Sequence, residues 1–111
     1  MRVVVQFEES CRPAMARWRR SLSANPVDQA ALSQVYLDEL KKRLVEHGGY
    51  PPGSVTAVGT EPRRYWAQLA GNMWVGYAIE TGGTFRRMRT IRVIECEPLP
   101  PSSAIPASPP A

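Results

Sequence analysis

RYWAQLAGNMWVGYAIE, from Arg64 to Glu80, carries the clearest structural pattern in this 111-residue chain. Its centre, Ala70-Gly71-Asn72, contains two residue types that tolerate positive φ, as a tight hairpin requires. The flanks on both sides are rich in aromatic and β-branched residues, the composition of a pleated, half-buried surface. The stretch therefore predicts two antiparallel strands joined by a short loop.

The length of this loop decides which side chains share a face of the hairpin. A two-residue loop would mix polar and apolar residues on both faces, because a one-residue slip moves every side chain of a strand to the other side. A three-residue loop separates them, and we favour it. One face then carries Tyr65, Ala67, Leu69, Met73, Val75, Tyr77 and Ile79, and the other carries Trp66, Gln68, Trp74, Gly76, Ala78 and Glu80.

The three-residue loop directs Trp66 and Trp74 away from the core. Clustered, exposed aromatic side chains mark a contact surface. The alternative is that a tail or a dimer partner covers the two rings.

Two helices are expected between a first strand and the hairpin. The strand is Arg2–Phe7, RVVVQF, whose consecutive valines favour an interior position in the sheet. The first helix runs from about Cys11 to Ala24 behind a Ser10 cap, and the second from Asn25-Pro26 to about His47. Their apolar stripes are Cys11, Met15, Trp18 and Leu22, and then Ala30, Leu32, Tyr36, Leu37, Leu40 and Leu44. The arginines of the first helix, Arg12, Arg17, Arg19 and Arg20, fall off its stripe and are expected in water.

The last strand is expected over residues 85–97, FRRMRTIRVIECE. If Ile91 and Val93 face the core, the odd-numbered residues Arg87 and Arg89 lie on the core side. Arg92 then lies on the opposite side of the sheet. Ile94 and Cys96 favour the opposite parity, so both remain open.

These elements predict one α+β domain over residues 1–97, with the order β-α-α-β-β-β and a helical hairpin packed on a four-stranded, mainly antiparallel sheet. Six of the fourteen residues from Pro98 to Ala111 are proline. That composition predicts an extended or disordered tail with no packed element.

Charge and composition limit the classes of function. The net charge is +4, and every basic residue outside the second helix is arginine, which favours an anionic partner such as nucleic acid or an acidic protein. No apolar run reaches 18 residues, so no membrane partner is expected. Two cysteines far apart in sequence, Cys11 and Cys96, indicate reduced thiols in a cytoplasmic protein.

Several kinds of site lack their residues. One histidine and two distant cysteines do not make a metal site, no glycine-rich phosphate loop is present, and we expect no cofactor. Arginines hold phosphates and tryptophan faces stack bases, so the remaining chemistry is that of an anion-binding or base-stacking surface. Its candidate residues are Arg63, Arg64, Trp66, Trp74, Arg86, Arg87, Arg89 and Arg92.

Residues 1–97 resemble the RelE/ParE superfamily, the toxins of type II toxin–antitoxin pairs. The resemblance lies in the order strand, helical hairpin, three-stranded meander, and in Arg63–Ile79, where WVGYAI is similar to the family's arginine-valine-tyrosine strand. It implies an antitoxin protein as partner. One branch of the family is a ribosome-dependent mRNA endonuclease that uses Lys, Arg and a C-terminal Tyr or His. Another branch inhibits DNA gyrase by binding.

The open-face positions where the nuclease branch keeps basic residues are Trp66, Gln68 and Trp74, and Glu95-Cys96-Glu97-Pro98 stands where Arg and a terminal Tyr or His are expected. These residues favour a ParE-like toxin that binds and inhibits its target. An RNA-binding mRNA interferase with Arg64 and Arg92 as catalytic residues is the first alternative, and a non-toxic interaction module is the second. The residues expected to bind the target are Arg63, Trp66, Gln68, Trp74, Arg86, Arg87 and Arg89. A homodimer is a further option for assembly.

Overall fold

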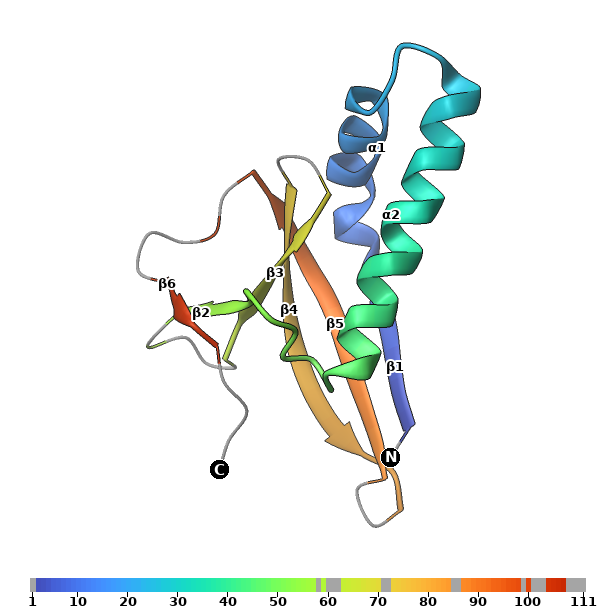
Figure 1. Cartoon of the computed structure of the whole chain (residues 1–111). Coiled ribbons are helices and arrows are strands. Elements are labelled where there is room, and N and C mark those ends of the chain that lie inside the picture. Colours follow the sequence, from blue (N-terminus) through green and yellow to red (C-terminus); the bar gives the residue numbers. More distant parts are fainter. Residues whose placement is uncertain are drawn as a thin grey trace.

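The computed structural model describes residues 2–57, 59, 63–70, 73–84, 87–98, 100 and 104–107. The elements run in the order β1 (Arg2–Phe7), η1 (Glu9–Cys11, a 3₁₀ turn), α1 (Arg12–Ser21), α2 (Pro26–Glu46), β2 (Val55–Ala57), β3 (Tyr65–Leu69), β4 (Met73–Gly82), β5 (Met88–Glu97) and β6 (Ala104–Pro106). Figure 1 shows two layers, with the α1–α2 hairpin on one face of a twisted sheet. The predicted α+β class is confirmed.

The sheet is larger than expected and mixed in direction. In the part of the chain that the structure describes, six strands, not four, follow the order β1-β5-β4-β3-β2-β6, and all neighbours are antiparallel except β1 and β5. The interior position predicted for β1 was wrong, because among the described strands β1 pairs with β5 alone and forms an edge. Its apolar character has another cause: Val3, Val5 and Phe7 pack against the core under the helices.

The expectation that no packed element follows Pro98 was wrong for residues 104–106. These residues form β6, which pairs antiparallel with β2, and the Ala107 N–H donates to the Ser54 carbonyl at 2.8 Å. A strand this short and exposed buries little apolar surface, so its hydrogen-bond partner, the free edge of β2, determines where it lies. Composition alone does not identify such a partner.

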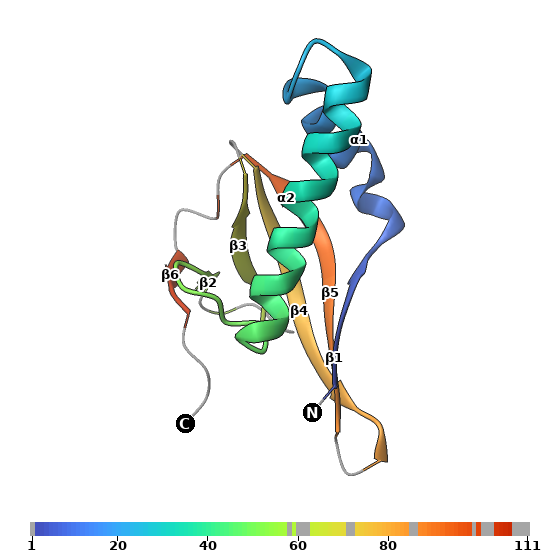
Figure 2. The ribbon, with the colours of Figure 1, turned by 45° about the vertical axis from the view of Figure 1, so that its right-hand side comes forward.

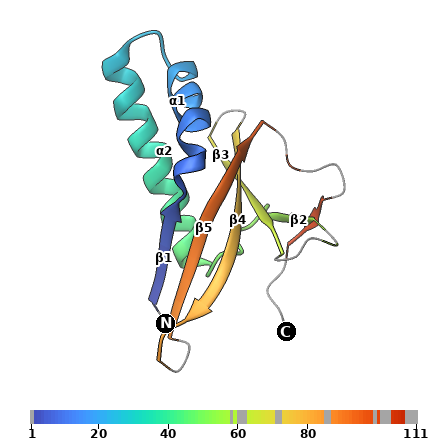
Figure 3. The same cartoon turned by 180° about the vertical axis from the view of Figure 1, so that it is seen from behind.

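The hairpin has the predicted register. Tyr65 pairs with Tyr77 and Leu69 with Met73, which leaves three residues between the strands. The loop residues Gly71 and Asn72 lie outside the described residues. The side chains assigned to the apolar face all belong to the core or pack against it. The other face of the sheet, seen in Figure 3 and called the open face below, carries Trp66, Gln68 and Trp74.

A β-bulge resolves the two parities left open for the last strand. Tyr77 pairs with Val93, but its neighbour Gly76 pairs with Glu95, so Ile94 is an extra residue. Ile91 and Val93 lie in the core as predicted, and Cys96 also packs against the core because the bulge restores its phase. The strand begins at Met88, later than the predicted residue 85.

The helices cover the sheet through the predicted stripes. Trp18 of α1 and Leu40 and Leu44 of α2 are buried in the core. Asn25 caps α2 by accepting from the Val27 N–H at 2.8 Å, as expected. The Ser10 cap was wrong, because η1 precedes α1 and the Ser10 hydroxyl donates to the Ile94 carbonyl instead. In Figure 2 the C-terminal half of α2 lies along the sheet, and its N-terminal half extends past the strands together with α1.

Candidate functional site

The two arginines assigned a catalytic role lie in one row across the open face. Arg92 pairs with Ala78 on β4, and Arg64, one residue before the Tyr65–Tyr77 pair, follows on the other side of Ala78. Neighbouring strands are about 5 Å apart, so roughly 10 Å separates the two backbone positions. The fold therefore brings both residues to one surface, and it decides the side of Arg92, which the sequence had left open.

Both arginines form ion pairs with glutamate side chains. The Arg92 Nη2 lies 2.8 Å from a Glu80 oxygen and its Nε 3.2 Å from a Glu8 oxygen, while the Arg64 Nη1 lies 3.4 Å from a Glu95 oxygen. We call Arg64, Arg92, Glu8, Glu80 and Glu95 the open-face charge cluster. Three carboxylates against two guanidinium groups give it a net charge of −1. Phosphate contacts depend on uncompensated positive charge, which these ion pairs reduce at Arg64 and Arg92.

Trp66 lies on the predicted face, and of the two alternatives for its ring, exposure does not hold. The ring is only 4% exposed, and it lies over the backbone of Gly76 on the next strand. A Cβ at Gly76 would come within 2.8 Å of two ring atoms. Because glycine leaves this space empty, the indole lies against the sheet and has no free face for a base. Trp74, by contrast, is half-buried.

The other predicted binding residues do not form one surface. Arg89 points to the core side, where its Nη1 donates to the Gly48 carbonyl at 2.9 Å just after α2 ends. This contact satisfies a carbonyl beyond the helix terminus and gives Arg89 a structural role. Arg63, Gln68 and Arg87 are exposed, and Arg86 lies outside the described residues.

The arginines of α1, expected in water, form an exposed basic face of the helix layer. Arg12, Arg17, Arg19 and Arg20 of α1 are all exposed, and α1 contains no acidic residue. Only Arg12 has an ion-pair partner among the described residues, Glu9 at 3.5 Å. We call these four residues the α1 arginine face. Their shared side of the helix was readable from the sequence, but the ion pairing that distinguishes them from Arg64 and Arg92 was not.

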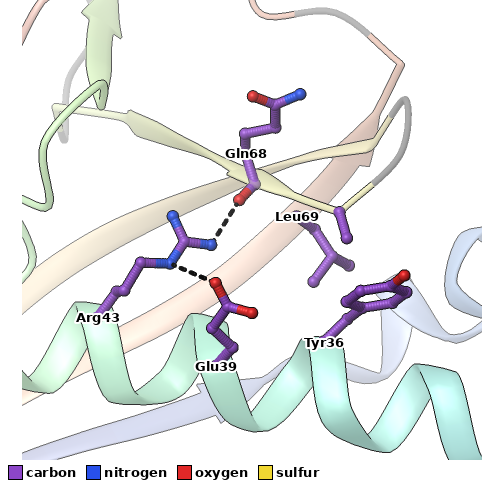
Figure 4. A pocket seen from close by; sticks show the side chains of 6 residues that line it. Tyr36, Glu39, Arg43, Gln68 and Leu69 are labelled. Carbon is purple, nitrogen blue, oxygen red and sulfur yellow. Dashed lines mark hydrogen bonds and ion pairs between the residues drawn. The ribbon is translucent and has the colours of Figure 1, made fainter.

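A pocket of about 210 Å³ lies between α2 and the end of β3 (Figure 4). The Arg43 Nη2 donates to the Gln68 carbonyl at 3.0 Å, and its Nε lies 4.0 Å from a Glu39 oxygen. Figure 4 shows the Gln68 amide pointing away from Arg43. These contacts tie the helix to the hairpin, so Arg43 acts as a structural support.

The two cysteines meet in space although 85 positions separate them in sequence. Both are free thiols that belong to the core or pack against it, and the Cys11 Sγ donates to the Val93 carbonyl at 3.5 Å. Burial raises the pKa of Cys96 to about 12 and also raises the pKa of Cys11. A thiol with a raised pKa is a poor nucleophile, so this pair is not a catalytic site.

Within the described ranges, no group of three His, Cys, Asp or Glu side chains could hold a metal ion. In the same residues, no helix has the length and apolar character needed to cross a membrane. Comparisons of the chain with protein-family models, with curated proteins and with solved structures found no match.

Proposed function

We propose that this chain is a toxin-like protein of a toxin–antitoxin pair, and that it inhibits a macromolecular target by binding it rather than by cutting RNA. The inference that the chain does not cut RNA rests on the ion pairs of Arg64 and Arg92. Both guanidinium groups form ion pairs with carboxylates of the open-face charge cluster.

Phosphoryl chemistry would require these arginines for the charge that develops on phosphorus. To reach an RNA phosphate, Arg92 would have to leave Glu8 and Glu80 at once, and the three glutamates of the cluster would repel the RNA backbone. Stacking of bases is also disfavoured, since the Trp66 ring is buried. A binding function needs none of these groups.

The α1 arginine face is the surface best suited to hold a target. Four exposed arginines on one helix, with a single ionic partner among the described residues, attract an acidic surface over roughly a Debye length, about 8–10 Å at ordinary salt. Guanidinium groups then bind carboxylates in a bidentate geometry. The contact surface of the proposed function is therefore α1, on the helix layer, rather than the open face.

The test is induction of the chain alone in a bacterial host, with growth followed over time. We compare it with two double variants, Arg17→Glu/Arg20→Glu on α1 and Arg63→Glu/Arg87→Glu away from it. Each changes the net charge from +4 to 0, so charge alone cannot explain a difference. The proposal expects growth arrest with the parent and the second variant, and at least a tenfold recovery of colony counts with the first.

Purified protein is then incubated with ribosomes that carry a defined mRNA. Intact mRNA at protein concentrations above those that arrest growth supports inhibition by binding. Cleavage that Arg92→Ala abolishes would instead establish the endonuclease alternative. Normal growth on induction of soluble parent protein would refute a toxin-like function altogether.

A further inference from the structure

The outer edge of β1 has unused backbone hydrogen-bonding groups. The Arg2 N–H donates to the Arg87 carbonyl and the Glu8 N–H to the Val93 carbonyl, both at 2.9 Å. Residues two apart on a strand direct their polar backbone groups the same way. Val3, Val5 and Phe7 therefore point their N–H and C=O groups away from β5, and no described strand pairs with them.

This edge lacks the features that normally prevent pairing with another strand. Exposed edges are protected by proline, bulges, inward charges or short length. The five residues between Arg2 and Glu8 contain no proline, no glycine and no charge. The opposite edge of the sheet differs, because β6 is three residues long and ends in Pro106. The two edges are therefore not equivalent, and β1 is the one built to accept a strand.

The sequence of β1 is complementary to itself when two copies run antiparallel about Val5. This register places Val5 against Val5 of the second copy, Val3 against Phe7, and Arg2 against Glu8. The outward-pointing residues then face one another as hydrogen-bonded pairs, and about six backbone hydrogen bonds form. Registers shifted by two residues keep the backbone pairing but lose the opposite charges.

One exposed apolar side chain, Val45, lies on the side of α2 that faces the end of β1. The Lys41 Nζ is 5.8 Å from the centre of the Phe7 ring, which places this side of α2 over the end of β1. Val45, one turn further along the same side, is 45% exposed. A second copy paired with β1 would lie next to this surface.

We propose that the occupant of the β1 edge is a second copy of this chain. Two β1 strands pair antiparallel about Val5 and join two six-stranded sheets into one. The assembly closes as a two-fold dimer because the other edge, β6, is too short to extend it. This inference does not depend on toxicity, since it concerns a different surface from the α1 arginine face.

Light scattering during size-exclusion chromatography measures the mass of the purified chain. The dimer predicts a mass of twice 12.3 kDa, falling toward 12.3 kDa on dilution. Val3→Pro keeps the pairing with β5, because the Val3 N–H points outward, but removes a donor from the new interface. We expect a monomer for this variant. A parent that stays at 12.3 kDa up to about 1 mM, a concentration at which even weak pairs form, would overturn the proposal and leave the edge to a different protein.

A disulfide test fixes the register. Val4 and Gln6 of two copies face each other as non-hydrogen-bonded pairs, with Cα atoms about 4.5 Å apart, inside the range that a disulfide spans. With oxidised glutathione as the electron acceptor, Val4→Cys/Gln6→Cys should cross-link into dimers on a non-reducing gel. Gln6→Cys alone, whose opposite residue is valine, should yield at least fivefold less. Equal cross-linking of the two variants would refute the register about Val5.

Discussion

The contact between Trp66 and Gly76 is open to a direct test by Gly76→Ala. The new Cβ would lie 2.8 Å from two atoms of the indole and 3.0 Å from a third. Ordinary carbon–carbon contacts begin at about 3.4–4 Å, so the ring or the strand must move by roughly 0.5–1 Å. Because Trp66 is only 4% exposed, its ring cannot move freely into solvent.

The expected loss of stability follows from two opposing effects. Overpacking of a filled site costs about 1–3 kcal/mol. Replacing glycine by alanine also restricts the unfolded chain, which stabilises the fold by about 0.4–1 kcal/mol. We therefore expect Gly76→Ala to lower the free energy of unfolding by about 1–2 kcal/mol. Gly82→Ala, at the end of the same strand with nothing within 4 Å of the added Cβ, is the matched control and should be neutral or slightly stabilising.

Urea unfolding followed by far-ultraviolet circular dichroism measures both variants without using tryptophan fluorescence. A double-mutant cycle with Trp66→Leu isolates the contact, because removal of the indole gives the new methyl group its space. In the Trp66→Leu background, Gly76→Ala should lower the free energy of unfolding by less than about 0.5 kcal/mol. A value this small is no larger than the deviation from additivity seen between sites that do not interact. Equal effects at Gly76 and Gly82, or an undiminished cost in the Trp66→Leu background, would show that the indole does not fill this site.

Three further predictions concern α2, the core and the thiol pair. Asn25→Ala removes the cap on the Val27 N–H and should lower the free energy of unfolding in urea by about 1 kcal/mol. Asn25→Gly should lower it by only about 0.3 kcal/mol. Equal losses for the two variants would exclude a capping role. Tyr77→Phe leaves the buried Gly49 carbonyl without its donor at 2.6 Å and should cost about 1–3 kcal/mol by the same assay; an unchanged midpoint would contradict this. The pKa of Cys96, raised from 9.0 to about 12 by burial, keeps the native thiol protonated at pH 9, so iodoacetamide should modify it at least 100-fold more slowly than in urea. The associated stability is present below pH 9 and is lost as the pH rises toward 12, so a urea midpoint that stays constant over that range would count against it.

Local sequence patterns were enough to predict most of the helices and strands and the sides on which they face the core. Period-two alternation and the size of the loop determined the hairpin faces, because a strand has only two sides and one register separated polar from apolar residues. The Asn25-Pro26 start of α2 and the apolar stripe of α1 were equally readable, since capping and helical spacing act over a few residues.

The candidate site was predicted only in part. Arg64 and Arg92 do share the open face, but alternation alone had left the side of Arg92 open. Their neutralisation was not predictable, because Glu8, Glu80 and Glu95 come from different parts of the chain and reach the arginines only when the sheet forms.

Tertiary structure alone decided which edges the sheet has, where Trp66 lies and which thiols meet. β1 could have been an interior strand by composition, but the order of pairing leaves it at the edge. The Gly76 gap that accepts the indole, the bulge that returns Cys96 to the core and the pairing of β6 with β2 all depend on contacts between different strands. Local propensity is set by a residue and its near neighbours. These outcomes instead depend on which long-range pairing leaves the fewest unfilled spaces and unpaired backbone groups, and that is settled only when the whole chain packs.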